Sequence, residues 1–225
     1  MLTSPRTSDL EFRELLTQFL ETYARHRPVR RVAVVGNAPL EPDAARAEQI
    51  DSADLVIRCN SFVLDKPGGE PRLGRRVDVV VLARVTRPTV DVFDEYWRRA
   101  YLVVDAGNSR TARPPRHLPT WPADLGCIPI PNSTLGLPLK SLLAPERDGY
   151  GVVPTTGTIA AYLGHELFPD AALTLAGYSF VDQPQQEEWQ HQYGTVVPVH
   201  STHWLDRESA LLQSWIDAGR AVLVR

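Results

Sequence analysis

Two histidines near the carboxyl end of the chain carry side chains that could perform acid–base chemistry. His200 and His203 lie in the segment HSTHWLDRE, in which Glu208 follows His203. An imidazole has an ordinary pKa of about 6.5, so its neutral form can take a proton from a hydroxyl group near neutral pH. We therefore predict a histidine general base. Five residues turn a helix by about 140°, so either His203 precedes the helix or Glu208 has a separate structural task.

A zinc site is the competing interpretation of the same histidines. Together with His191 they could supply three nitrogen ligands. His-x-x-His is typical of zinc sites only when it lies on a helix with suitable acidic residues. Cys59 and Cys127 are the only cysteines, too few for a cysteine-rich metal site. We predict that the protein holds no metal.

Phosphate binding is one chemistry that residues 154–158, PTTGT, could perform, since they precede an apolar helical pattern. Free backbone N–H groups at a helix start, the hydroxyls of Thr155 and Thr156, and the helix dipole would attract a phosphate. On local grounds alone we favour an ordinary threonine cap. Gly157, within the same turn, narrows the margin between the two interpretations.

Polar residues also follow two of the apolar runs. Gly36 and Asn37 come after VAVV, and Asn60 comes after VIRC. In parallel sheets ligands gather at the carboxyl ends of strands, where a glycine lets backbone approach a ligand and an asparagine amide both donates and accepts. These residues are therefore candidates for contacts with a nucleotide, although Gly36 could instead only permit a tight turn.

Arg58 places a charge inside the apolar run VIRC. Such a charge is costly to bury unless it is paired or bound to an anion. Arg58 is therefore either a ligand contact or a structural partner for a carboxylate, and we favour the structural role. The candidate partners are Asp51, Asp54 and Asp78.

A parallel sheet would bring these residues together. Continuous apolar runs, typical of strands that are covered on both faces, occur at residues 32–35, 54–58, 77–82, 101–104, 127–130, 173–177 and 221–224. Helices are expected within residues 88–100, 157–167 and 203–218. This alternation predicts an α/β fold in which helices flank a mainly parallel sheet. We expect a single Rossmann-like domain over residues 1–225, with a helix within residues 1–28 packed on it.

Composition excludes several classes of protein. The 225 residues carry a formal net charge of -3, which gives no general reason to expect binding to nucleic acid or to an anionic membrane. No apolar run approaches the roughly 20 residues that cross a bilayer, and no signal-peptide pattern is present. We expect a cytoplasmic protein without a membrane span.

Four segments resemble, in order, the motifs of glycosyltransferase family 29, the sialyltransferases. Gly36-Asn37 with IDSADLVIRCNSF and GRRVDVVV is similar to the large motif, and PTTGT through LTLAGYSF is similar to the small motif. His191-Gln192-Tyr193 resembles the third motif, and His203 with Glu208 matches HxxxxE. The resemblance covers residues 31–210 and implies a compact, soluble, bacterial-type member with a fold like a variant of GT-A.

The resemblance implies an inverting glycosyltransferase that moves a sialic-acid-like or Kdo-like sugar from a CMP-sugar to a hydroxyl acceptor. No metal or other cofactor is implied, and the chain contains no Asp-x-Asp sequence to hold one. His203 would be the base in preference to His200, because only His203 fits HxxxxE, while Arg58 and Glu208 would have supporting roles. The residues that would bind the nucleotide are Gly36, Asn37, Asn60, Thr155, Thr156, Gly157, His191 and Tyr193.

Two other functions stay open at this point. The protein could hydrolyse CMP-sugars or related cytidine nucleotides, or it could bind a nucleotide without turnover. Animal members of the family have a membrane anchor and a disulfide between the large and small motifs, neither of which we expect here. Residues 108–122, which include Arg110, Arg113 and Arg116, are expected to be exposed, as a solvated loop or as a lid over an acidic sugar.

Overall fold

The computed structural model describes residues 7–84, 86, 88–105 and 121–225. The strands of its main sheet are β1 (Arg31–Val35), β2 (Leu55–Cys59), β3 (Val79–Ala83), β4 (Ala100–Val104), β5 (Ile128–Pro129), β6 (Ala172–Ala176) and β9 (Ala221–Val224). They lie in the order β5-β4-β3-β2-β1-β6-β9, and every neighbouring pair is parallel. The predicted α/β fold with a mainly parallel sheet is confirmed, and each predicted strand is present.

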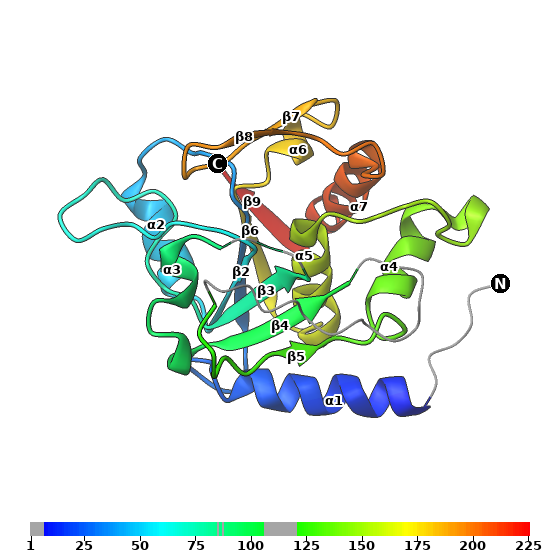
Figure 1. Ribbon diagram of the computed structural model, residues 1–225, viewed down its shortest axis with the longest axis horizontal. Helices are drawn as coiled ribbons and strands as arrows, with labels where there is room; N and C mark the ends of the chain where they lie inside the picture. Colours follow the sequence, from blue (N-terminus) through cyan, green and yellow to red (C-terminus); the bar gives the residue numbers. More distant parts are fainter. Residues whose placement is uncertain (1–6, 85, 87, 106–120) are drawn as a thin grey trace.

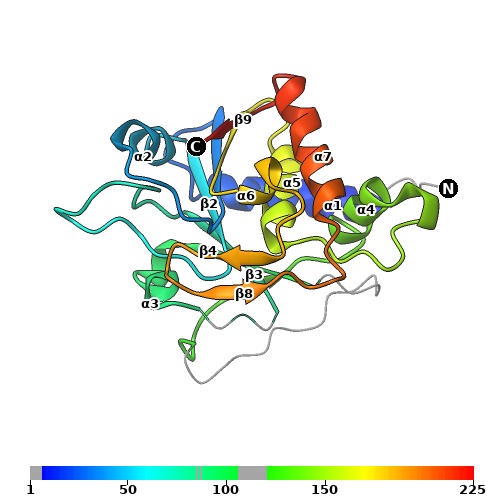
Figure 2. The same cartoon turned by 90° about the horizontal axis from the view of Figure 1, so that it is seen from above.

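Helices cover both faces of this sheet. The α-helices are α1 (Thr7–Glu21), α2 (Ala44–Asp51), α3 (Val90–Phe93), α4 (Gly136–Leu143), α5 (Thr156–Leu167), α6 (Ser179–Asp182) and α7 (Leu205–Asp217), and the 3-10 helices are η1 (Tyr96–Arg98) and η2 (Pro145–Arg147). Both views separate α2 and α3 from α4, α5 and α7 (Figures 1 and 2). None of the helices in the described ranges is long and apolar enough to cross a membrane.

The core has separate parts on the two faces of the sheet, because the side chains of each strand alternate between the faces. Val32 and Val34 of β1 pack in the cluster that includes side chains of α1, α4, α5 and α7, whereas Ala33 and Val35 pack with α2. Successive residues of a strand point to opposite faces, so a strand with a helix layer on each side needs apolar residues throughout. The continuous apolar runs of the sequence follow from this arrangement.

The predicted helix within residues 88–100 forms only in part, as two short pieces. The chain forms α3 and then η1, because Asp94 is extended and Glu95 is left-handed, with φ 47°. The Arg99 side chain explains the interruption, since its Nη1 donates to the carbonyls of Asp91 and Val92 at 2.7 and 3.2 Å. Those carbonyls would otherwise accept the hydrogen bonds that continue the helix.

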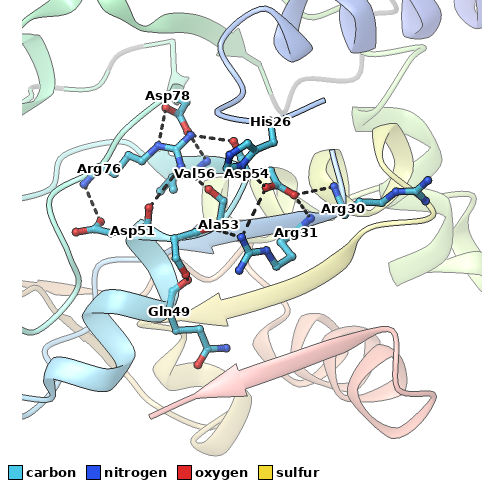
Figure 3. A network of polar contacts seen from close by, with 11 residues as sticks. His26, Arg30, Arg31, Gln49, Asp51, Ala53, Asp54, Val56, Arg76 and Asp78 are labelled. Carbon is cyan, nitrogen blue, oxygen red and sulfur yellow. Dashed lines mark hydrogen bonds and ion pairs between the residues drawn. The ribbon is translucent and has the colours of Figure 1, made fainter. Parts of the chain in front are cut away.

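A network of polar side chains ties the amino ends of β1, β2 and β3 together (Figure 3). The Asp54 carboxylate accepts the backbone N–H groups of Arg30 and Arg31, both at 2.9 Å. Asp78 accepts the N–H of Val56 at 2.7 Å and forms an ion pair with Arg76 at 2.9 Å. Backbone groups at the ends of buried strands need such partners. These acidic residues of the large-motif segments therefore stabilise the amino ends of the strands, at the opposite end of the sheet from the carboxyl ends.

Arg58 is fully buried and also has structural contacts. Its Nε donates to the carbonyl of Arg76 at 3.0 Å and its Nη2 donates to the carbonyl of Leu73 at 2.6 Å. Its guanidinium lies 5.7 Å from the centre of the Phe62 ring. Burial lowers the pKa of Arg58 to about 10. Backbone carbonyls thus supply its hydrogen bonds, while the charge of Asp51, one of the three carboxylates that we expected, opposes the effect of burial on its pKa.

A small antiparallel hairpin lies over the carboxyl ends of the central strands. It consists of β7 (Glu188–Gln190) and β8 (Val196–Pro198), and Figure 1 shows it above β6 and β9. The N–H of Gln192, in the hairpin turn, donates to the carbonyl of Asn37 at 2.8 Å. The hairpin is therefore attached directly to the end of β1.

Candidate nucleotide-binding and catalytic site

A cavity of about 230 Å³ opens between the carboxyl ends of β1, β2 and β6, the start of α5 and the hairpin. The predicted site residues that line it are Gly36, Asn37, Asn60, Thr155, Thr156, Gly157, His191 and His203. Arg58, Tyr193, His200 and Glu208 are not among its lining residues. The fold thus brings most of the predicted residues to one concave site.

Gly36 allows the ends of β1 and β6 to approach each other closely. Its N–H donates to the carbonyl of Ala176 at 2.8 Å. A Cβ atom added at Gly36 would lie 2.4 Å from the carbonyl oxygen of Gly177, which itself has φ 70°. Only glycine fits this approach without moving the backbone. Gly36 therefore keeps two adjacent walls of the cavity together.

Asn37 and Asn60 each use one end of the side-chain amide for the protein. Asn37 Nδ2 donates to the carbonyl of Cys59 at 3.0 Å. Asn60 Oδ1 accepts from the N–H of Ala83 and from the hydroxyl of Thr86, both at 2.8 Å, and these bonds hold Asn60 at φ 52°. Within the described residues, Asn37 Oδ1 and Asn60 Nδ2 have no partner. The cavity therefore offers one amide acceptor and one amide donor.

The start of α5 offers backbone donors. Thr155 is the cap residue, and its Oγ1 accepts from the N–H of Thr158 at 3.1 Å. The N–H groups of Thr156 and Gly157 lie in the first turn, where no intrahelical carbonyl can accept them. Both residues line the cavity. This arrangement suits an anionic group such as a phosphate.

Thr155 combines two functions that the sequence left as alternatives. It caps α5, and it also lines the cavity. Its N–H and its hydroxyl lie 3.0 and 2.7 Å from Glu208 Oε2. Its hydrogen-bonding groups are thus turned toward the protein, and the hydroxyl at the helix start that has no partner in the described part of the chain is that of Thr156.

His203 has a defined tautomer. Its Nδ1 lies 2.6 Å from the carbonyl oxygen of Val153, and a carbonyl can only accept, so Nδ1 carries the proton. Nε2 then carries the lone pair. Burial lowers the pKa of His203, the hydrogen bond to Val153 opposes that effect, and the nearby His200 adds to it. The neutral imidazole that a general base requires is therefore favoured.

His200 differs from His203 in its exposure and in its hydrogen-bond partner. It is exposed, and its Nδ1 bonds to the hydroxyl of Thr202 at 2.8 Å. The rings of the two histidines lie 6.3 Å apart, but only His203 lines the cavity. His203 also precedes α7, whose first turn carries Glu208. Both of the options that we gave for the His203–Glu208 spacing therefore hold.

The hairpin contributes His191 and Tyr193, which stack at 4.8 Å with nearly parallel rings. His191 lines the cavity, and burial lowers its pKa. Burial raises the pKa of Tyr193, whereas hydrogen bonding with Thr195 and Ser61 lowers it. Tyr193 thus lies behind His191, and its predicted role in nucleotide binding stays a prediction.

Several lining residues were not predicted. Tyr178 follows the end of β6, is buried, and donates its hydroxyl hydrogen to the carbonyl of Gly157 at 2.8 Å. Trp189 of β7 packs edge-on against Phe180 and His203, at 6.0 and 6.4 Å between ring centres. The strand-end argument used for Asn37 would also have selected Tyr178. Nothing in the local sequence indicated Trp189.

Metal ligation finds no support among the described residues, which contain no group of three or more His, Cys, Asp or Glu side chains able to hold an ion. Residues 108–120, the greater part of the predicted exposed segment with its three arginines, lie outside the described residues. Both alternatives for this segment, a solvated loop and a lid over an acidic sugar, therefore stay predictions.

Comparison with known proteins gives structural matches only. No family model and no curated protein sequence matches the chain. A crystal structure of a mammalian sialyltransferase in complex with Gal-beta-1-3GalNAc-ortho-nitrophenol matches with a TM-score of 0.56 and 16% identity, over 99% of this chain and 87% of that chain. A second mammalian sialyltransferase structure matches with a TM-score of 0.51 and 15% identity over the same shares. The chain therefore has the fold of the sialyltransferases, as its four motif-like segments indicate.

Proposed function

We propose that this protein is a glycosyltransferase that moves a sialic-acid-like or Kdo-like sugar from a CMP-sugar to a hydroxyl acceptor. The observation that carries the proposal is the position of His203. This residue, with its lone pair on Nε2, lines the same cavity as amide groups of Asn37 and Asn60 and N–H groups of Thr156 and Gly157 that have no partner among the described residues. The sialyltransferase fold supports the same reaction.

The nucleotide would bind along the strand ends. Asn37 Oδ1 and Asn60 Nδ2 would contact the cytidine, and the N–H groups of Thr156 and Gly157 with the Thr156 hydroxyl would bind its phosphate. The positive end of the α5 dipole favours a phosphate at this place. His191 would line the same site, with Tyr193 stacked behind it.

The reaction then needs one proton transfer and one substitution. His203 Nε2 removes the proton of the acceptor hydroxyl, and the oxygen attacks the anomeric carbon from the side opposite CMP. The bond between that carbon and the phosphate oxygen breaks, and CMP departs with the electron pair. Fixed N–H donors stabilise the charge that develops on the phosphate. Attack from the opposite side inverts the anomeric configuration, and the protein donors make a metal unnecessary.

Nucleotide selectivity provides the first test. Thermal shift and calorimetry with CMP, UMP, AMP, GMP and S-adenosylmethionine should show stabilisation mainly by CMP, because selective binding to the native state raises its stability. Preference for another nucleotide would refute the proposal.

Product release separates the remaining possibilities. CMP should be released from CMP-sialic acid or CMP-Kdo only when a hydroxyl acceptor such as Gal-beta-1-3GalNAc is present. Equal release without acceptor would indicate hydrolysis instead. CMP binding without release from either donor, with a panel of acceptors, would indicate a binding module. The predicted cytoplasmic location is part of the proposal and can be tested by fractionation of the source cells.

A further inference from the structure

Glu208 is a buried carboxylate without a cationic partner. Its side chain is fully buried, and no ion pair within the described residues includes it. Burying an uncompensated carboxylate is costly, and an apolar side chain would fill the same space without that cost. The groups that contact the carboxylate must therefore offset the cost of burying it.

Three donors converge on a single oxygen of Glu208. Oε2 accepts from the N–H of Thr155 at 3.0 Å, from the hydroxyl of Thr155 at 2.7 Å and from the hydroxyl of Thr158 at 2.5 Å. The other oxygen, Oε1, is buried and has no hydrogen-bond partner in the ranges that the structure describes. These three hydrogen bonds thus hold the first turn of α5 from within the protein interior.

This contact decides which groups of the helix start face the cavity. A threonine hydroxyl has one hydrogen, so neither Thr155 nor Thr158 can donate to a ligand while its hydrogen points to Glu208. The N–H groups of Thr156 and Gly157 have no acceptor among the residues that the structure describes. Glu208 therefore holds the first turn with those two donors toward the bound phosphate.

The same stretch of chain is bonded to the loop of the base. His203 donates to the carbonyl of Val153, and the N–H of Val153 donates to the carbonyl of Thr202 at 3.0 Å. Residues 153–158 are thus joined to residues 202–208 at two places, one at the base and one at Glu208. These two attachments fix the position of the imidazole relative to the phosphate donors.

We propose that Glu208 is a positioning residue, which locks the start of α5 to the start of α7 and so sets the geometry between His203 and the departing phosphate. This inference rests on the proposed function. It assigns the glutamate of HxxxxE a place behind the phosphate-binding turn, out of contact with the substrate.

Glu208→Gln tests the inference with little change in volume. An amide cannot accept all three donors without leaving its own N–H groups buried beside them. Since a displacement of about 1 Å at a reacting centre can lower the rate about 100-fold, kcat should fall by that order, while the Kd for CMP rises less than about 10-fold. Asp206→Asn, an exposed acid-to-amide change in the same turn of α7, should leave both values unchanged.

A matched pair at Thr158 covers the case in which Glu208→Gln does not fold. Thr158→Val keeps the shape and removes the hydroxyl, and it should lower kcat. Thr158→Ser keeps the hydroxyl and should recover most of that loss. Equal kcat for the valine and serine variants would overturn the inference.

The pH dependence of kcat is a further measurement, and a purely structural role of Glu208 would not change it. Burial raises the pKa of Glu208 to about 7, with the hydrogen bonds from Thr158 and Thr155 opposing the rise. The wild-type kcat should therefore fall as the pH drops through about 7, because a protonated carboxyl is a weaker acceptor for the three donors and holds the turn less firmly. In Glu208→Gln only the protonation of His203 remains, so the acid limb should move to lower pH.

The outcomes separate this inference from the proposed function. A wild-type protein that neither binds CMP nor releases it from CMP-sialic acid would refute the proposed function, and the inference with it. An active wild type whose Glu208→Gln variant keeps its kcat and its acid limb would refute the inference alone. A loss confined to CMP affinity would also refute it.

Discussion

Gly36→Ala is the sharpest structural perturbation that the cavity allows. The new Cβ would lie 2.4 Å from the carbonyl oxygen of Gly177, whereas ordinary contacts begin near 3.4 Å. Backbone groups on both sides are fixed, since Gly36 donates to Ala176 at 2.8 Å and Ala38 donates to Gly177 at 3.1 Å. The ends of β1 and β6 must therefore separate by about 1 Å, because close-packed backbone cannot absorb the overlap in any other way.

The expected cost follows from two opposing effects. Overpacking in a core costs about 1–3 kcal/mol, and the reduced freedom of the unfolded chain returns about 0.4–1 kcal/mol. We expect the free energy of unfolding to fall by about 1–2 kcal/mol, which lowers Tm by about 2–8 °C for a chain of this size. The shift of Asn37 should also weaken CMP binding by about tenfold, the equivalent of one hydrogen bond.

Urea denaturation and calorimetry with CMP would measure these effects. Gly126→Ala is the matched control, because a Cβ there meets no atom within 4 Å and Gly126 has an ordinary φ. It should be as stable as the wild type or slightly more stable. If Gly36→Ala and Gly126→Ala had the same stability and the same CMP affinity, the close approach of β1 and β6 would be refuted as the reason for glycine.

Three further predictions concern single side chains. His203→Ala should lower kcat by about 10²–10⁴-fold, the range of general-base catalysis, with CMP affinity nearly unchanged. His200→Ala should keep most of the activity, and the reverse result in steady-state kinetics would exchange their roles. Asn60→Ala should lower both stability and CMP affinity, because alanine at φ 52° is strained and cannot accept from Ala83 and Thr86. Asn60→Gly should recover part of the stability but not the affinity. If calorimetry showed that both recover, the contact between the Asn60 amide and CMP would be contradicted. Burial alone would raise the pKa of Asp54, but hydrogen bonds from Arg30, His26 and Arg31 outweigh it and the pKa is lowered. The stabilisation from Asp54 is therefore present above its unfolded pKa of about 3.9 and lost as the pH falls through the lower folded value. Asp54→Asn should be less stable than the wild type at pH 7, and a denaturation series that shows no narrowing of this difference toward acid pH would contradict the network.

The strands and their polar ends could be predicted from the sequence because both faces of the sheet are covered. A run such as VAVV is apolar throughout only where Val32 and Ala33 meet different helix layers. Once the strands are parallel, Asn37 and Asn60 must meet, since β1 and β2 are neighbours. The gathering of these residues therefore followed from the pattern.

The parts that could not be predicted depend on contacts distant in sequence. The break after α3 depends on Arg99 reaching the carbonyls of Asp91 and Val92. The hairpin was missed because the residues of β8 are exposed, so no apolar alternation marks it. The preference for His203 over His200 came from the resemblance to HxxxxE, whereas no local pattern indicates the contact of His203 with the carbonyl of Val153, fifty residues earlier.

The pairing of β1 with both β2 and β6 has a consequence for the order in which the protein can assemble. On one side Val32 of β1 pairs with Leu55 of β2, which follows within about 25 residues of chain. On the other side it pairs with Leu173 of β6, which is synthesised far later. Contacts between distant segments form slowly because closing long loops costs entropy. During synthesis one edge of β1 therefore stays open to the solvent or to a chaperone until β6 emerges. A stalled or truncated chain would expose that apolar edge to aggregation, so the yield of intact protein should depend on how quickly the second half follows the first.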